Sequence, residues 1–110
     1  MGNIYIEDIT TSLPYFKCKQ CNIIVFLTNT ILTSIINFGF MNKYYITNGS
    51  FNVYNLDNMY ELKINKMRYM CNSLICRKCN CIVGYKILEC KNEKQYNNCF
   101  IFCNSYINKN

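Results

Sequence analysis

The chain has 110 residues, of which 51% are hydrophobic, 15% aromatic and 16% charged, and its formal net charge is +6. This length and composition suit one folded domain and exclude a two-domain enzyme or a Rossmann or TIM scaffold. The chain contains no His. A Cys–His catalytic pair and a His-ligated metal site are therefore excluded as well.

The nine Cys residues are the most unusual part of the composition. In a short secreted chain they would indicate disulfides, but Glu7 and Asp8 stand near the start, where a secretory signal carries basic residues. An odd number of Cys also prevents complete pairing. We therefore expect reduced thiols, some of them bound to a metal.

Three regions follow from the distribution of residue types along the chain. Residues 1–12 form an N-terminal lead-in that we expect to be disordered, residues 13–106 form the domain, and residues 107–110 form a polar C-terminal tail. Short runs of β-branched and aromatic residues, bounded by Asn, Gly or Asp, predict a mainly β domain. The predicted strands are Ile23–Leu27, Ile31–Ile36, Tyr44–Thr47, Phe51–Tyr54, Met67–Met70, Ile82–Leu88 and Cys99–Cys103.

The sequence between two of these predicted strands is typical of a β-turn. Asn48 and Gly49 separate Tyr44–Thr47 from the run that ends at Tyr54. Because Asn and Gly both tolerate positive φ angles, this dipeptide predicts a β-hairpin that joins the two runs.

The segment Ile23–Met41 has no charged residue over 19 positions, which is close to the length of a membrane-spanning helix. Asn29 and Asn37 would be costly inside a lone span, because buried amides without partners lose hydrogen bonds to water. We predict strands of the sheet core here, with membrane association as the alternative.

Two short segments, which we call the first knuckle (Cys18–Cys21) and the second knuckle (Cys76–Cys79), follow one pattern. Each reads Cys-(Lys/Arg)-x-Cys-Asn-x-Ile-Val. Two residues between thiolates let a tight turn direct both sulfurs at one ion, and two such turns supply the four ligands of a tetrahedral site. We predict that one structural Zn²⁺ is bound by Cys18, Cys21, Cys76 and Cys79.

Other interpretations of the knuckles stay open at this point. Iron also binds four Cys sulfurs, and two separate structural or redox Cys pairs would also explain the two C-x-x-C segments. A closed four-sulfur site has no open position for substrate or water. We therefore predict no catalytic and no cofactor-binding residues besides the metal ligands, and no enzyme activity.

Basic residues accompany the ligands, since Lys17, Lys19, Arg77 and Lys78 all flank or interrupt the two knuckles. We interpret them chiefly as compensation for the negative charge of four thiolates, with a nucleic-acid contact as the alternative. The remaining thiols are expected to be buried small hydrophobes, with Cys81 also a competing metal ligand. They are Cys71, Cys81, Cys90, Cys99 and Cys103.

The residues around the second knuckle resemble a known family. The segment Leu74–Tyr85 reads hydrophobic-x-Cys-x-x-Cys-x-x-hydrophobic-hydrophobic-Gly-aromatic and is similar to the second zinc knuckle of the Yippee family. The segments Leu13–Cys21 and Tyr96–Cys103 look more like its Mis-eighteen branch, the centromere-licensing proteins. The resemblance covers roughly residues 13–106.

This resemblance implies a β-tent of two antiparallel sheets, clamped at one end by zinc on the four Cys residues. It also implies a non-enzymatic interaction module in a nuclear complex that marks centromeres for the centromeric histone variant. The expected partners are chromatin-assembly proteins and further copies of the chain, and no membrane contact is expected. From the basic residues around the knuckles, non-specific DNA contact stays an open alternative. The expected location is the nucleus, at centromeres, with the cytoplasm as the alternative.

Two positions relate the sequence to the family pattern in opposite ways. Gly84, five residues after the last ligand, is expected to supply a positive φ angle or a close approach of two backbones. After the first knuckle the equivalent position is Phe26, where family members usually have Gly.

Two other functions are weaker alternatives. A generic Yippee-like or cereblon-like adaptor would bind a protein or small ligand, but the cereblon type uses a Trp cage and this chain has no Trp. Methionine sulfoxide reductases share the β-tent, and the segment Arg68–Ser73 is similar to their nucleophile segment. Without a base, Cys71 is expected to keep its ordinary pKa.

Overall fold

The computed structural model describes residues 13–37, 39 and 42–110, and these residues form a mainly β structure, as the sequence predicts. The strands are β1 (Tyr15–Cys18), β2 (Ile24–Leu27), β3 (Ile31–Asn37), β4 (Asn42–Thr47), β5 (Val53–Asn55), β6 (Tyr60–Ile64), β7 (Met67–Cys76), β8 (Ile82–Glu89), β9 (Phe100–Cys103) and β10 (Ile107–Lys109). Two short 3-10 helices, η1 (Thr28–Thr30) and η2 (Lys94–Tyr96), precede β3 and β9.

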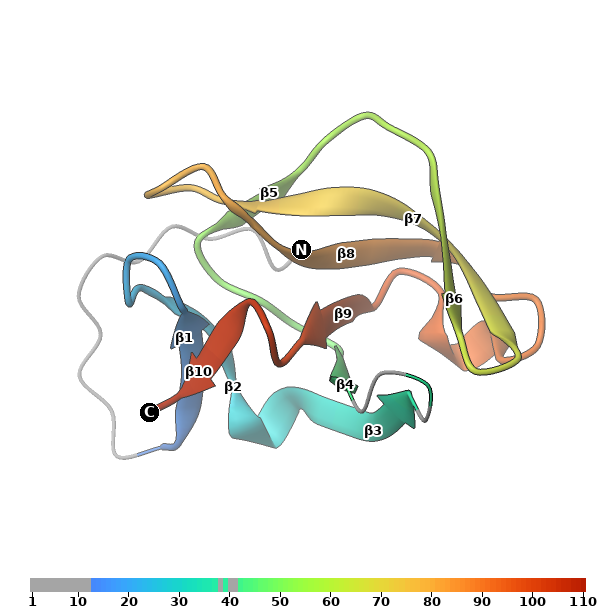
Figure 1. Cartoon of the computed structure of the whole chain (residues 1–110), viewed down its shortest axis with the longest axis horizontal. Helices are drawn as coiled ribbons and strands as arrows, with labels where there is room; N and C mark the ends of the chain where they lie inside the picture. Colours follow the sequence, from blue (N-terminus) through green and yellow to red (C-terminus); the bar gives the residue numbers. More distant parts are fainter. Residues whose placement is uncertain (1–12, 38, 40–41) are drawn as a thin grey trace.

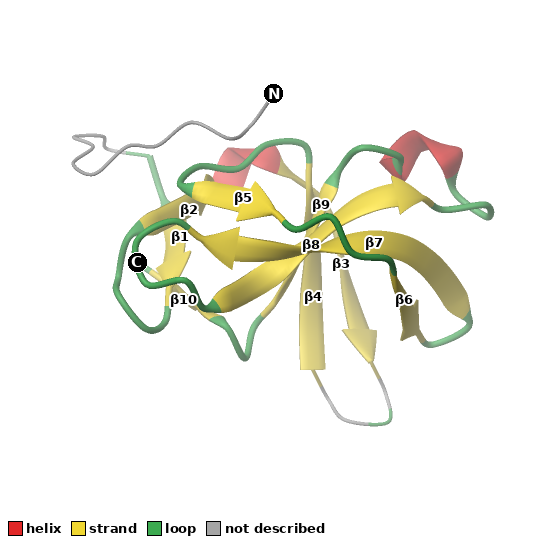
Figure 2. Cartoon of the chain, turned by 90° about the horizontal axis from the view of Figure 1, so that it is seen from above, coloured by secondary structure: helices red, strands yellow, loops and turns green. Residues whose placement is uncertain are grey.

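The strands form two antiparallel sheets, which confirms the predicted architecture (Figure 1). The smaller sheet has the order β10-β1-β2, and the larger has the order β3-β4-β9-β8-β7-β5, with β6 also paired to β7. β7 is long enough, at 10 residues, to hold β5 and β6 one after the other along one edge. Figure 2 shows β3 and β4 running across the direction of β7 and β8, which is the strong twist of a large antiparallel sheet.

One hydrophobic core joins the two sheets through stacked aromatic rings. The ring of Phe26 lies 4.7 Å from that of Phe16 and 4.6 Å from that of Phe102, measured between centroids. Phe16 and Phe26 come from the small sheet and Phe102 from the large one. The side chain that departs from the family's Gly is therefore the central ring of this core, where its burial and stacking stabilise the contact between sheets.

A second core lies on the large sheet, among residues such as Ile46, Tyr69 and Ile87. It includes four of the remaining thiols, Cys71, Cys90, Cys99 and Cys103, all buried as predicted. The prediction is wrong for Cys81, which is exposed. This residue lies two positions after Cys79, the last residue of the second knuckle.

The predicted hairpin at Asn48 and Gly49 is wrong. β4 pairs with β3 and β9, whereas β5 pairs with β7 at the other edge of the sheet. Neither residue has a positive φ angle, so the turn that the dipeptide favours does not form. The backbone N–H of Asn48 donates instead to the carbonyl of Thr30, 3.1 Å away.

The uncharged segment Ile23–Met41 contains β2, η1 and β3, as the sequence predicts, although residues 38, 40 and 41 lie outside the described part of the chain. Within that part, no helix is long and apolar enough to cross a membrane. The lead-in over residues 1–12 also falls outside the described residues. The expected tail does not stay apart from the sheets, because β10 pairs with β1, with Cys18 opposite Ile107.

Gly84 lies where two strands approach closely. A Cβ atom at this position would meet the carbonyl oxygen of Ile101 at 2.3 Å and the ring of Phe102 at 2.9 Å. Its φ angle is not positive, so of the two expected reasons for Gly only the close approach is confirmed. The absence of a side chain lets β8 pair with β9 beside the second knuckle.

Gly84→Ala is expected to lower the free energy of unfolding by about 1–3 kcal/mol, because the new methyl group would overlap backbone atoms that cannot rotate away. Denaturant unfolding of the metal-loaded protein measures the change. Gly49→Ala is the matched control, since the new Cβ atom would lie 3.8 Å from Cγ2 of Thr30, an ordinary van der Waals contact. Equal stability of the two variants would contradict this explanation of Gly84.

Candidate metal centre

Both knuckles fold by the same backbone hydrogen bonds. In the first, the N–H of Asn22 donates to the carbonyl of Cys18 at 2.8 Å, and the N–H of Cys18 donates to the carbonyl of Ile23 at 2.8 Å. The second repeats this pattern, with Asn80 donating to Cys76 and Cys76 to Cys81, each at 2.9 Å. The repeated sequence pattern therefore produces a repeated turn.

The Asn residue that follows each knuckle has a structural role that explains its recurrence. Asn22 has a φ angle of 65° and Asn80 one of 62°. Among residues with a side chain, Asn is one of the few that adopt this left-handed conformation readily. At these positions the chain reverses direction, so the second Cys of each knuckle turns back toward the first.

The four predicted ligand sulfurs meet at one point between the sheets. All four Sγ atoms lie within 4.8 Å of one another. The Sγ atoms of Cys18 and Cys79 are 3.6 Å apart, and those of Cys21 and Cys76 are 3.5 Å apart. Both of these short distances join one knuckle to the other, and both exceed the ~2.05 Å of a disulfide.

These distances fit a tetrahedral ion. Zinc–sulfur bonds of about 2.3 Å place the sulfurs of a tetrahedral site about 3.8 Å apart. The donor set, four thiols and no oxygen or nitrogen, is also the one that suits zinc or iron. The residues present therefore fit the metal that the sequence predicts.

Burial makes the isolated thiols poor acids. Burial raises the pKa of Cys18 to about 11 and raises the pKa of Cys76 further. Burial also acts on Cys79, but hydrogen bonds from the Cys81 backbone and the neighbouring sulfurs outweigh it and lower its pKa to about 7. A metal must therefore displace protons from Cys18 and Cys76 at neutral pH, and its attraction to thiolate supplies the free energy for that exchange.

Asn52 connects the two knuckles, a role that sequence analysis missed. Its side-chain amide donates to the carbonyl of Ile24, 2.9 Å away, just after the first knuckle. Its backbone carbonyl accepts from the N–H of Arg77, 2.8 Å away, inside the second. Asn52 is fully buried and has a φ angle of 62°. Nothing in the local sequence distinguishes it from the chain's many other Asn residues.

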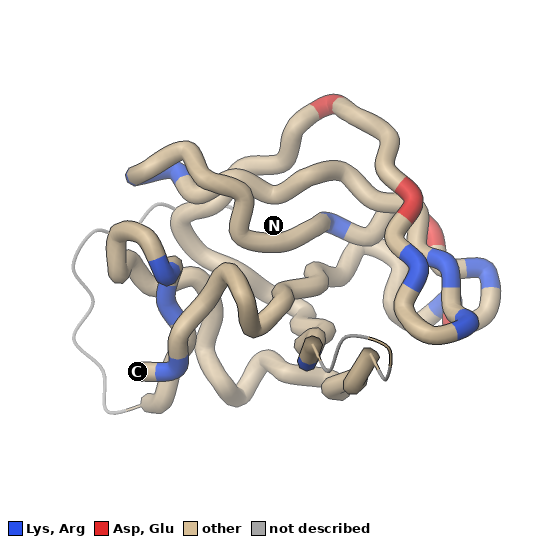
Figure 3. Tube along the Cα trace, in the orientation of Figure 1, with Lys and Arg blue, Asp and Glu red and all other residues tan. Residues whose placement is uncertain are grey.

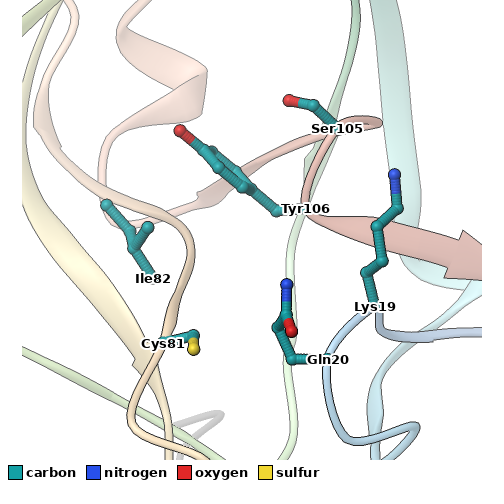
Figure 4. Close-up of a pocket in the computed structure, with 6 residues that line it drawn as sticks. All are labelled: Lys19, Gln20, Cys81, Ile82, Ser105 and Tyr106. Carbon is teal, nitrogen blue, oxygen red and sulfur yellow. The ribbon is translucent and has the colours of Figure 1, made fainter.

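A small pocket lies beside the metal centre, between the knuckles and the turn that joins β9 to β10. Its volume is about 160 Å³. Figure 4 shows Lys19 and Gln20 of the first knuckle on one side of the pocket and Cys81 and Ile82, which follow the second knuckle, on the other, with the ring of Tyr106 between the two pairs. The first knuckle is tied to this turn, because the N–H of Lys19 donates to the Tyr106 carbonyl at 3.1 Å.

Cys71 is not placed for catalysis. It lies on β7 in the second core, fully buried. Burial, and beyond it the neighbouring Cys90, raise its pKa to about 12. The expectation of an ordinary pKa is therefore wrong. At neutral pH this thiol is protonated and buried, so Cys71 does not have the exposed thiolate that the nucleophile of a sulfoxide reductase needs.

No protein-family model matches the sequence, and no curated protein matches it. Among solved structures, the chain is similar to the crystal structure of the Mis18 "Yippee-like" domain, with a TM-score of 0.71 over 90% of this chain and 96% of the other. The fold is that of a Yippee-like domain. Sequence identity to that structure is 17%. The Yippee-like fold and the cluster of four sulfurs agree with the resemblance seen in the sequence.

Asn22→Val is expected to lower the free energy of unfolding by about 1–2 kcal/mol, because a β-branched residue resists the left-handed conformation. The side chain of Asn22 is exposed, so packing changes little. Asn22→Gly is the control and should keep the stability of the parent, since Gly adopts a φ angle of this sign freely. Denaturant unfolding and the rate of zinc loss to a chelator measure both effects. A valine variant as stable as the glycine variant would contradict the explanation that Asn22 is needed for its left-handed conformation.

Proposed function

We propose that this protein is a zinc-stabilised, non-enzymatic interaction module of the Mis18 type. The observation that carries the proposal is the convergence of Cys18, Cys21, Cys76 and Cys79 within a Yippee-like fold. One Zn²⁺ per chain would occupy this site. When bound there, zinc supplies a fixed link between the two sheets.

The surroundings of the site support a structural rather than a catalytic role for the metal. Four protein sulfurs complete a tetrahedral shell and leave no position for substrate or activated water. Cys18 and Cys76 are fully buried, and Cys21 and Cys79 are partly buried. The site therefore offers a substrate no free coordination position.

The centromeric part of the proposal rests on similarity of fold and of motif. In this reading the domain acts in the nucleus, at centromeres, where it joins proteins that deposit the centromeric histone variant. Protein partners and further copies of the chain would bind the surfaces of the two sheets. The similarity to the Mis18 domain extends over most of both chains, which supports a role for the whole domain rather than for the knuckles alone.

Elemental analysis of the purified chain is expected to find about one zinc per molecule. Cys76→Ser should lose the metal, because a hydroxyl is a poor ligand for zinc and three thiolates leave the shell open. Cys81→Ser is the matched control: Cys81 is exposed and adjoins the same knuckle, and the variant should keep its zinc. Zinc loss from Cys81→Ser, together with retention in Cys76→Ser, would show a different ligand set.

Removal of zinc by a chelator is expected to unfold the small sheet first. β1 and β2 are joined to the large sheet by the proposed metal, by the aromatic stack that ends at Phe102 of β9, and by Asn52, whereas the second core lies away from the site. Amide hydrogen exchange should show lost protection in β1, β2 and β10 before β7 and β8. Unchanged exchange throughout the small sheet after full zinc removal would contradict a structural metal.

Imaging of the tagged protein in dividing cells tests the location. Focal signal at centromeres, and co-purification of the centromeric histone or its chaperone, is the expected result. A diffuse cytoplasmic signal throughout division would count against the centromeric role while leaving the metal site intact, since elemental analysis reports on the latter separately.

A further inference from the structure

Among the described residues, the charged side chains of the two knuckles, β1, β2 and β10 are all basic. Folding brings together cations from three parts of the chain that are distant in sequence (Figure 3). We call this surface the basic end; it consists of Lys17, Lys19, Arg77, Lys78 and Lys109. Lys109 joins it because β10 pairs with β1, with Phe16 opposite Lys109. All five except Lys17 are exposed, and Lys17 is partly exposed.

Acidic residues of the described part of the chain lie elsewhere. They are Asp57, Glu61, Glu89 and Glu93. None is in β1, β2, β10 or either knuckle. At the opposite end of the molecule, by contrast, Figure 3 shows Asp or Glu positions among the Lys and Arg positions near the β6–β7 turn. The two ends therefore differ in the balance of charge and not in the number of Lys residues alone.

Compensation of the metal centre does not account for this surface. A zinc ion with four thiolates has a formal charge of about −2, so five cations leave a surplus of about three. Within the described residues, none of these five side chains donates a hydrogen bond to a ligand sulfur. Arg77 is held instead by the Val53 carbonyl, 3.3 Å from its Nε, and by the ring of Tyr54, 5.9 Å from its Cζ.

The pocket beside the metal centre lies within this surface and offers suitable donors. Lys19, Gln20 and Ser105 line it with an ammonium, an amide and a hydroxyl group. These are groups that bind phosphate oxygens in nucleic-acid complexes. Tyr106 adds an aromatic ring between the knuckles (Figure 4). The pocket's volume of about 160 Å³ suits a compact anionic group.

We propose that the basic end binds the phosphate backbone of a nucleic acid, with one phosphate seated at the pocket. Lys19 lines the pocket itself, and Arg77 and Lys78 precede the residues Cys81 and Ile82 that line its other side. Cations spread over two turns and β10 match a chain of spaced charges better than a single anion. The four turn residues Lys19, Gln20, Arg77 and Lys78 are all polar, whereas stable membrane anchoring takes an apolar side chain or a lipid in addition to basic residues. Binding of this kind reads charge and not base sequence.

This inference goes beyond the proposed function and does not require the centromeric role. It requires only that the knuckles are folded, which zinc content reports independently. Glu7 and Asp8 lie outside the described residues, so the experiment uses the whole zinc-loaded chain, in which their charges are present.

The test measures fluorescence anisotropy of a labelled 20-base-pair DNA duplex, and of a single strand of equal length, at several salt concentrations. Affinity is expected to fall with salt, with a log–log slope near −0.9 for each duplex phosphate that the basic end neutralises. Lys19→Gln and Lys78→Gln should each weaken binding and reduce the magnitude of the slope by about one. The comparison of duplex and single strand assigns which form is preferred.

Lys63→Gln and Lys66→Gln are the matched controls, since both residues are exposed Lys near the β6–β7 turn. They should leave affinity and slope unchanged, and all four variants should keep their zinc. Three results would overturn the proposal: no binding of either DNA at 50 mM salt, equal losses in the control variants, or equal affinity for an acidic peptide or for phosphatidylserine vesicles of matched charge.

Discussion

The contact between the two knuckles is the constraint on which the rest of the structure depends. Four Sγ atoms within 4.8 Å of one another would be an unfavourable group if all were ionised and no cation lay among them. Zinc bound by thiolates contributes about 10–16 kcal/mol to the folding of small zinc fingers, which is comparable to the whole stability of an ordinary domain, about 5–15 kcal/mol. A chain of this size can therefore rely on one ion to hold a three-stranded sheet against a larger one.

Backbone and side-chain contacts around the sulfurs support this contact. Each knuckle closes through two hydrogen bonds of 2.8–2.9 Å and an Asn in the left-handed conformation, and buried Asn52 bonds to both sides. The aromatic stack through Phe26 then fixes the distance between the sheets. Polar and apolar contacts thus position the sulfurs, and the ion adds strength to an arrangement that the chain already favours.

The same convergence concentrates positive charge. Because the knuckle turns carry Lys and Arg between and beside the ligands, any fold that unites the four sulfurs also unites these cations. The pairing of β10 with β1 adds Lys109. A cluster of four sulfurs and a charged surface are therefore two consequences of one pair of motifs. A zinc ion on four thiolates would have a charge of about −2 and would leave the five surrounding cations in excess.

The sequence by itself determined the features that depend on local spacing: the mainly β class, most strands, and the two knuckles with their four thiols, because a C-x-x-C turn needs no distant partner. Only the tertiary structure decided the strand order, the role of β10 and Asn52, the exposure of Cys81, and the failure of the Asn48-Gly49 hairpin. β4 pairs with β9, although more than half of the domain's sequence lies between them. Such distant partners are selected by the burial of whole faces of the sheet. A local turn preference is too weak to oppose that selection.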